Sequence, residues 1–158
     1  MGKYEIIKHY ETFNQWLVDL KKLKDEDWYR PIAKGKWSVG AIIAHLLLWD
    51  EYSLRERFPF MTEGNKLEPF PNFQIINDQA DDYAKKHSKD ELIDQLVALR
   101  KKHFIEKLKL VDDTYLQISF SIGDHKLKIL DYLNDFIYHD LHHKKQIDSF
   151  VNLLYEFE

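Results

Sequence analysis

Apolar residues recur every three or four positions along several stretches of the chain, which is the period of an amphipathic helix. In residues 4–23 these apolar positions are separated by Lys, Glu and Asp. The same spacing returns in residues 92–110 and again in residues 129–155. The pattern predicts three helices that each bury one face, as helices do in a bundle.

A fourth stretch, residues 39–49, is apolar on nearly every side and reads VGAIIAHLLLW. A helix without a polar face is a buried helix. Its only ionisable residue, His45, should therefore lie in a dry environment. Ser38 precedes the stretch, and its hydroxyl can accept a hydrogen bond from an unpaired backbone amide, which predicts that the helix begins there. The helix should end before Pro59.

The sequence predicts further elements between these four helices. Residues 58–73 contain three of the four prolines and several Phe residues, so we expect a long loop that packs on the bundle. A short helix is expected from about residue 74. Ser88 is followed three residues later by Glu91, which is the signature of a helix start. Two alternating segments flank Gly123 and predict a small hairpin.

Together these elements predict an all-α protein, a four-helix bundle with a long loop and a small hairpin. The chain has 158 residues, which fits one domain spanning residues 1–158. Five glycines and four prolines are too few for a turn-rich β-sandwich or barrel. Hydrophobic residues make up 44% of the sequence and charged residues 32%, which is typical of a globular protein in water.

Charge and composition narrow the possible partners. The net charge is -4, whereas proteins that bind nucleic acid through phosphates are usually basic. There is no cysteine, which excludes disulfides and protein thiolate ligands and suits a reducing compartment. The N-terminal stretch lacks the apolar core of a signal peptide, and no apolar run reaches the roughly 18 residues of a membrane span. We therefore expect a cytoplasmic protein that binds neither nucleic acid nor membranes.

The last predicted helix carries a pair of histidines with chelating spacing. His139 and His143 are four residues apart, so they lie one turn apart on one helix face. At about 100° per residue, this pair lies at the edge of the apolar face, whereas His142 points toward solvent. Such pairs bind transition metals. They also occur by chance, as does a lone buried histidine such as His45.

The two observations support each other. A buried neutral imidazole without a partner is costly, and a metal held on a neighbouring helix would remove that cost. We therefore predict a metal site made by His45, His139 and His143. Three nitrogen ligands leave positions open for water or substrate and suit a divalent transition metal, with zinc or nickel favoured over magnesium or calcium. Because imidazole binds metal only when neutral, affinity should fall as the pH drops through about 6.5.

No catalytic residue and no further cofactor-binding residue can be assigned from the sequence. Three carboxylates could orient a ligand imidazole, but an ordinary place on the helix surface is the favoured interpretation for each: Asp50, Asp135 and Asp140. Three aromatic residues could line a pocket, with core packing favoured: Trp37, Trp49 and Tyr52. Gln146 lies on the helix side of His139 and could touch the site. No partner is evident for the remaining histidines: His9, His87, His103 and His125.

Two segments resemble a known family. The segment Trp37-Ser38 to His45-Leu46 resembles the W-S-x-x-x-x-x-x-H-L motif of the second helix in DinB-like proteins, also called YfiT-like. The segment from His139 to Ile147 resembles the H-x-x-x-H-x-x-Q-I ending of the same family. The resemblance implies an up-down-down-up four-helix bundle with a long crossover, a metal on the three histidines, and a homodimer.

The resemblance also implies an activity on small molecules. Members of the family include S-transferases that use a low-molecular-weight thiol such as bacillithiol, and the family is described as metalloenzymes. We therefore expect a metal-dependent enzyme that transfers a thiol or hydrolyses a small substrate. The alternative is a non-catalytic, stress-related protein that binds a small ligand. A third interpretation is purely structural, with the histidines hydrogen-bonded in a metal-free core.

Overall fold

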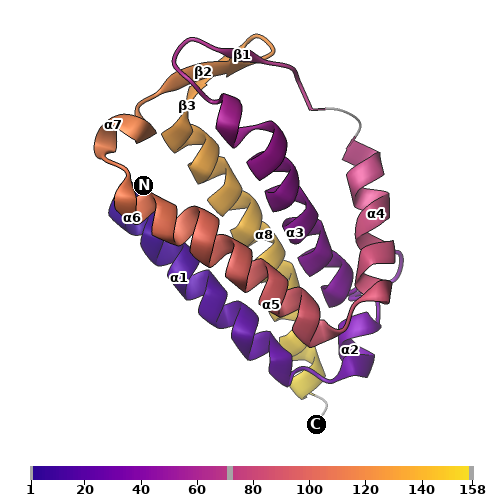
Figure 1. Cartoon of the computed structure of the whole chain (residues 1–158). Coiled ribbons are helices and arrows are strands. Elements are labelled where there is room, and N and C mark those ends of the chain that lie inside the picture. The colour runs from indigo at the N-terminus through magenta and orange to yellow at the C-terminus, as the bar shows by residue number, and fades with distance from the viewer. Residues whose placement is uncertain (1, 71–72, 157–158) are drawn as a thin grey trace.

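The computed structural model describes residues 2–70 and 73–156, most of which are helical (Figure 1). Its longer helices are α1 (Lys3–Asp19), α3 (Val39–Glu56), α4 (Phe73–Lys86), α5 (Lys89–Arg100) and α8 (Ile129–Glu156). Shorter helices are α2 (Asp25–Tyr29), α6 (Lys107–Leu110) and α7 (Asp113–Leu116). The strands are β1 (Lys66–Leu67), β2 (Ser119–Ile122) and β3 (His125–Lys128).

Four of these helices form the bundle that the sequence predicts. Helix α1 packs against α5 and α8, and α3 packs against the same two helices, so α1 and α3 lie on opposite corners (Figure 1). Helix α4 covers the outer side of α3 on the way from α3 to α5. The expected short helix after residue 74 is therefore a 14-residue helix that forms an outer layer.

Two serines set the starts of the helices, as predicted. The Ser38 hydroxyl accepts a hydrogen bond from the Ala41 amide at 3.1 Å at the beginning of α3. The Ser88 hydroxyl accepts one from the Glu91 amide at 3.1 Å at the beginning of α5. Each bond satisfies an amide that the helix itself leaves unpaired. Local sequence therefore fixes where the helix carrying His45 begins.

A small sheet departs from the all-α prediction. Strands β2 and β3 form the predicted antiparallel hairpin, and Gly123 turns between them with a φ of 58°, a conformation that favours glycine. Strand β1 adds to β2 in parallel register. Part of the predicted loop at residues 58–73 is therefore a strand, and Phe58–Phe60 form a short 3-10 turn. Residues 71–72 of that loop lie outside the described residues.

The predicted helix over residues 88–110 is not regular throughout. Lys101–Glu106 form π-helical turns between α5 and α6. Arg100, Phe104 and Leu108 are nevertheless all buried. Wider turns of this kind are rare in proteins, but those that occur often lie near functional sites. The irregular segment begins directly after Arg100, a buried residue of the site described below.

The core consists of two apolar clusters with a polar layer between them. Each bundle helix contributes residues to both clusters. Along α3, for example, Leu47 belongs to the first cluster and Leu54 packs on the second. The charged side chains of Asp50, Arg100 and Asp140 are buried and lie between the residues that belong to the first cluster and those that belong to the second. Within the described residues, no helix combines the length and apolar character that crossing a bilayer requires.

Candidate metal centre

The three predicted ligands meet in this polar layer. His45 comes from α3, and His139 and His143 come from successive turns of α8. The Nε2 atom of His139 lies 3.3 Å from Nε2 of His45 and 3.1 Å from Nε2 of His143. One nitrogen from each ring lies within 4.8 Å of the other two, an arrangement that can hold a metal ion. His142 is exposed, as the helical pattern predicts.

The outer nitrogens of two rings are held by amide side chains. Nδ1 of His45 donates a hydrogen bond to Oδ1 of Asn77 on α4, at 3.1 Å. Nδ1 of His143 donates to Oε1 of Gln146, one turn further along α8, at 2.9 Å. A neutral imidazole carries one hydrogen, so both rings then present a bare lone pair at Nε2. Histidine ligands of metals are typically oriented by such outer hydrogen bonds.

The Nε2 lone pairs that the cluster leaves without a hydrogen bond fit a cation. The lone pairs on His45 and His143 both face Nε2 of His139. That atom carries at most one hydrogen, so it can satisfy only one of them. A cation at the centre would satisfy all three nitrogens. Nitrogens bound tetrahedrally at 2.0–2.1 Å from zinc are about 3.3–3.4 Å apart, close to the two short separations seen here.

All three rings are held in the neutral form that binds metal. Burial, followed by the neighbouring His143 and His139, lowers the pKa of His45 to about 3. Burial and His143 lower the pKa of His139 to about 4. The pKa of His143 is also lowered, mainly by burial. At neutral pH the cluster therefore carries no charge that would repel a divalent cation.

A second buried cluster joins the same helices next to the histidines. The Arg100 guanidinium binds Asp50 on α3 through Nε at 2.7 Å and through Nη2 at 3.2 Å. It binds Asp140 on α8 through Nη1 at 2.8 Å and Nη2 at 2.9 Å. His9 on α1 adds a contact of 3.0 Å to Asp140. We call these four residues the ionic cluster; it connects all four helices of the bundle.

The ionic cluster corrects three expectations. Asp50 and Asp140 are not surface carboxylates but are each 1% exposed, and His9 has a partner. Asp135 is exposed, as expected. The sequence does contain a signal for Arg100, because it lies four residues after Leu96 and four before Phe104 in the apolar stripe. A charge in such a stripe needs buried partners of opposite sign.

The two carboxylates of the ionic cluster titrate in opposite directions. Burial raises the pKa of Asp50 to about 6, although Arg100 acts against this rise. The pKa of Asp140 is lowered, because Arg100 and the hydrogen bond from His9 outweigh burial. The carboxylates raise the pKa of Arg100 despite its burial. At neutral pH all three groups are charged and paired.

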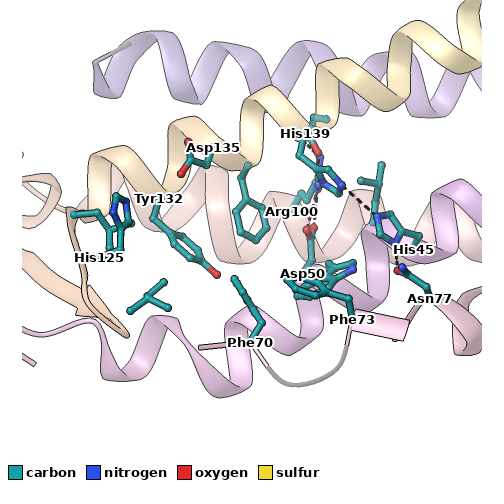
Figure 2. Close-up of a pocket in the computed structure, with 16 residues that line it drawn as sticks. His45, Asp50, Phe70, Phe73, Asn77, Arg100, His125, Tyr132, Asp135 and His139 are labelled. Atoms are coloured by element: carbon teal, nitrogen blue, oxygen red, sulfur yellow. Dashed lines mark hydrogen bonds and ion pairs between the residues drawn. The ribbon is translucent and has the colours of Figure 1, made fainter. Parts of the chain in front are cut away.

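A cavity of about 490 Å³ opens beside His45 and His139 (Figure 2). It extends along α3 and α8 to the hairpin, so that His45 and His125 lie at opposite ends of the view. Trp49 lines this cavity, which corrects its expected role in core packing. The Trp37 ring lies 5.1 Å from the His45 ring. Asn77 had no signal in the sequence, because its contact depends on how α4 packs on α3.

Comparison with known proteins agrees with this architecture. The sequence profile of the DinB superfamily matches residues 7–147. The chain belongs to the DinB superfamily. No curated protein matches it.

Among solved structures, this DinB-superfamily chain is similar to YfiT from Bacillus subtilis, with 18% sequence identity and a TM-score of 0.79. The match covers 96% of this chain and 87% of YfiT. YfiT is described as a probable metal-dependent hydrolase with an unusual four-helix bundle topology. At this identity the similarity shows a shared fold.

Proposed function

We propose that this protein is a metal-dependent enzyme that hydrolyses a small molecule, with His45, His139 and His143 as the metal ligands. The observation that carries the proposal is the set of three neutral imidazoles whose lone pairs converge beside a cavity. Three protein ligands leave coordination positions open, as in catalytic rather than structural metal sites. The description of YfiT as a probable metal-dependent hydrolase supports the same reaction class.

Each part of the site has a role in this proposal. When bound, a divalent metal supplies a Lewis acid that lowers the pKa of a nucleophile toward neutrality. Asn77 and Gln146 keep the proton of His45 and His143 on Nδ1, so that Nε2 stays available. Arg100 holds Asp50 and Asp140, and thereby fixes the distance between the two helices that carry the ligands.

Transfer of a low-molecular-weight thiol is the second candidate. The chain has no cysteine, so a thiol at the metal would have to come from a diffusible co-substrate. The site suits zinc or nickel, which accept nitrogen ligands. The up-down-down-up order of the helices is part of the proposal, supported by the long connection through α4 between α3 and α5 (Figure 1). A homodimer and a cytoplasmic location stay predictions.

The experiment uses protein without a His tag. Elemental analysis should find a stoichiometric transition metal. The zinc- and nickel-loaded proteins are then incubated with chromogenic esters and amides, with and without a thiol. Hydrolysis without thiol supports the first candidate, and consumption of thiol together with an electrophile supports the second.

Two variants serve as matched controls for this assay. Turnover should be lost in His143→Ala and kept in His142→Ala, which changes the exposed neighbouring histidine. Metal binding without turnover of either kind would favour a non-catalytic ligand-binding protein. Absence of metal binding would reject the proposed site and leave the histidines as a structural, metal-free cluster.

A further inference from the structure

The cavity beside the histidines has walls of aromatic and aliphatic side chains. On one side Trp49 lies 5.2 Å from Phe70 and 5.4 Å from Phe73, measured between ring centroids, and the two Phe rings are 5.5 Å apart. Tyr132 of α8 lies on the facing side (Figure 2), and Phe136 of the same helix packs against Tyr132 and also lines the cavity. The hairpin closes the end away from His45 and His139 with Ile122, Leu127 and His125. A ligand in this cavity therefore meets apolar surface along its length.

The charged groups in the wall do not offer a free cation. Among the described residues that line the cavity, Arg100 is the single arginine or lysine. Its guanidinium N–H groups are hydrogen-bonded to Asp50 and Asp140. Asp135 adds a third carboxylate near the hairpin, where it interacts electrostatically with His125, which lines the same end. Three carboxylates against one guanidinium make the wall electrostatically unfavourable for an anion.

The neutral polar groups in the wall are also engaged. The Tyr132 hydroxyl is hydrogen-bonded to the Ser53 hydroxyl at 2.9 Å. The Asn77 carbonyl oxygen accepts a hydrogen bond from Nδ1 of His45. An anionic group brought into the channel would lose hydration beside carboxylates of the same sign. At the end of the cavity near His45 and His139, the open metal positions are thus the polar anchor for a ligand.

We infer that this cavity selects a substrate with an extended apolar body, aromatic or alkyl, that carries no anionic group and is attached to one metal-binding polar group. The polar group lies at the three histidines, and the body lies along Trp49, Phe70 and Phe73 toward the hairpin. The inference rests on the proposed function, because it takes the metal as the anchor. It adds the class of substrate and excludes carboxylates and phosphates in the body of that substrate.

The test measures binding of hydroxamates, which chelate metals through one end, to the zinc-loaded protein by calorimetry at pH 8. Acetohydroxamate reports the metal centre alone. A 4-phenylbenzohydroxamate adds an apolar body, and we expect it to bind roughly 10- to 100-fold more tightly because the rings leave water. An analogue with a terminal carboxylate should lose most of this gain.

Two variants in α4 test where the apolar body of the ligand lies. Phe73 is 54% exposed and lines the cavity, so Phe73→Ala should fold and should reduce the gain from the two rings several-fold. Ile75 is 56% exposed on the same helix but is not part of the wall, so Ile75→Ala should keep the whole gain. Acetohydroxamate should bind equally to both variants.

Each outcome separates this inference from the proposed function. Equal affinity for acetohydroxamate and the biphenyl compound would overturn the apolar channel and leave the metal centre intact. Binding of the carboxylate as tight as that of the neutral compound, or tighter, would overturn the exclusion of anions. If acetohydroxamate does not bind to zinc-loaded protein, the open metal site itself is rejected, and the inference is rejected with it.

Discussion

The histidine cluster and the ionic cluster connect the same two helices, α3 and α8, but they satisfy their buried polar atoms differently. In the ionic cluster, four hydrogen bonds join Arg100 to the two carboxylates, so opposite charges compensate each other. In the histidine cluster, three neutral rings face one another with more lone pairs than hydrogens. The first cluster is complete within the chain, and the second leaves lone pairs that a cation would satisfy.

This difference indicates that the ionic cluster supports the helices, whereas the histidine cluster is the candidate binding site. Asp50 follows His45 by five residues on α3, and Asp140 directly follows His139 on α8. The complete cluster therefore holds the two ligand-bearing helices at a fixed separation before any metal arrives. A site positioned in this way loses little conformational freedom on binding, which favours affinity. Both clusters border the cavity, and the incomplete one does so through His45 and His139.

The largest expected effect comes from breaking the complete cluster. Arg100→Met leaves Asp50 buried without its ion-pair partner and leaves Asp140 with His9, which should lower the free energy of unfolding by about 3–5 kcal/mol. Urea denaturation followed by circular dichroism measures this change. Arg55→Met is the matched control, because Arg55 is exposed on α3 and pairs with Glu56 at the surface, where such pairs contribute little.

Removal of every charge from the cluster sharpens the interpretation. The triple variant Asp50→Asn, Arg100→Met, Asp140→Asn leaves no unpaired buried charge and should recover much of the stability that the single variant loses. If Arg100→Met were as stable as Arg55→Met, the ionic cluster would not hold the helices together.

The next largest effect concerns the metal itself. His143→Ala removes one of three ligands and should weaken zinc or nickel binding by more than about 100-fold, beyond what loss of an outer hydrogen bond costs. Calorimetric titration measures the affinity. His142→Ala should bind as wild type, because that ring is exposed. Equal affinity of the two variants would contradict histidine ligation at this site.

A smaller effect is expected at Asn77. Asn77→Ala removes the acceptor that holds the His45 proton on Nδ1, and should weaken metal binding by about 10- to 100-fold. Asn77→Asp keeps an acceptor oxygen and should restore the affinity. The exposed neighbour Gln79 provides the control Gln79→Ala, with no expected change. A loss in Asn77→Asp as large as in Asn77→Ala would show that the hydrogen bond does not orient His45.

The contributions of the histidines and of Asp50 to the stability of the protein change with pH in opposite directions. The histidines have pKa values lowered in the folded protein, to about 3 for His45 and about 4 for His139, so the unfolded chain binds more protons below its own pKa of about 6.5. Their contribution to stability is therefore lost as the pH falls from about 6.5 toward 4. Asp50, with its pKa raised to about 6, acts in the opposite direction between about 4 and 6.

Three histidines outweigh one carboxylate, so metal-free protein should become less stable as the pH falls from 7 to 4, by up to about 1.4 kcal/mol per pH unit for each histidine. Thermal unfolding at a series of pH values measures the slope. Replacement of His45 by Asn should make it shallower. Because the pKa values of His45 and His139 are lowered, we expect protons to compete with metal below pH 6.5.

Local sequence was sufficient for the parts of the fold that depend on neighbours along the chain. The periodic apolar positions predict the bundle helices, and Ser38 and Ser88 predict where two of them begin. The hairpin follows from alternation around Gly123. Strand β1, the π-helical turns and the length of α4 were missed, because each depends on contacts with segments that are distant in sequence.

By itself, the sequence determined the bundle, the set of three histidines and the exclusion of His142, because helical periodicity decides which side chains share a face. Only the tertiary structure decided what surrounds those histidines. Arg100, Asp50, Asp140 and Asn77 lie far apart in the chain and acquire partners only when helices pack. A buried charge is stable only beside its partner, and that partner is chosen by the fold.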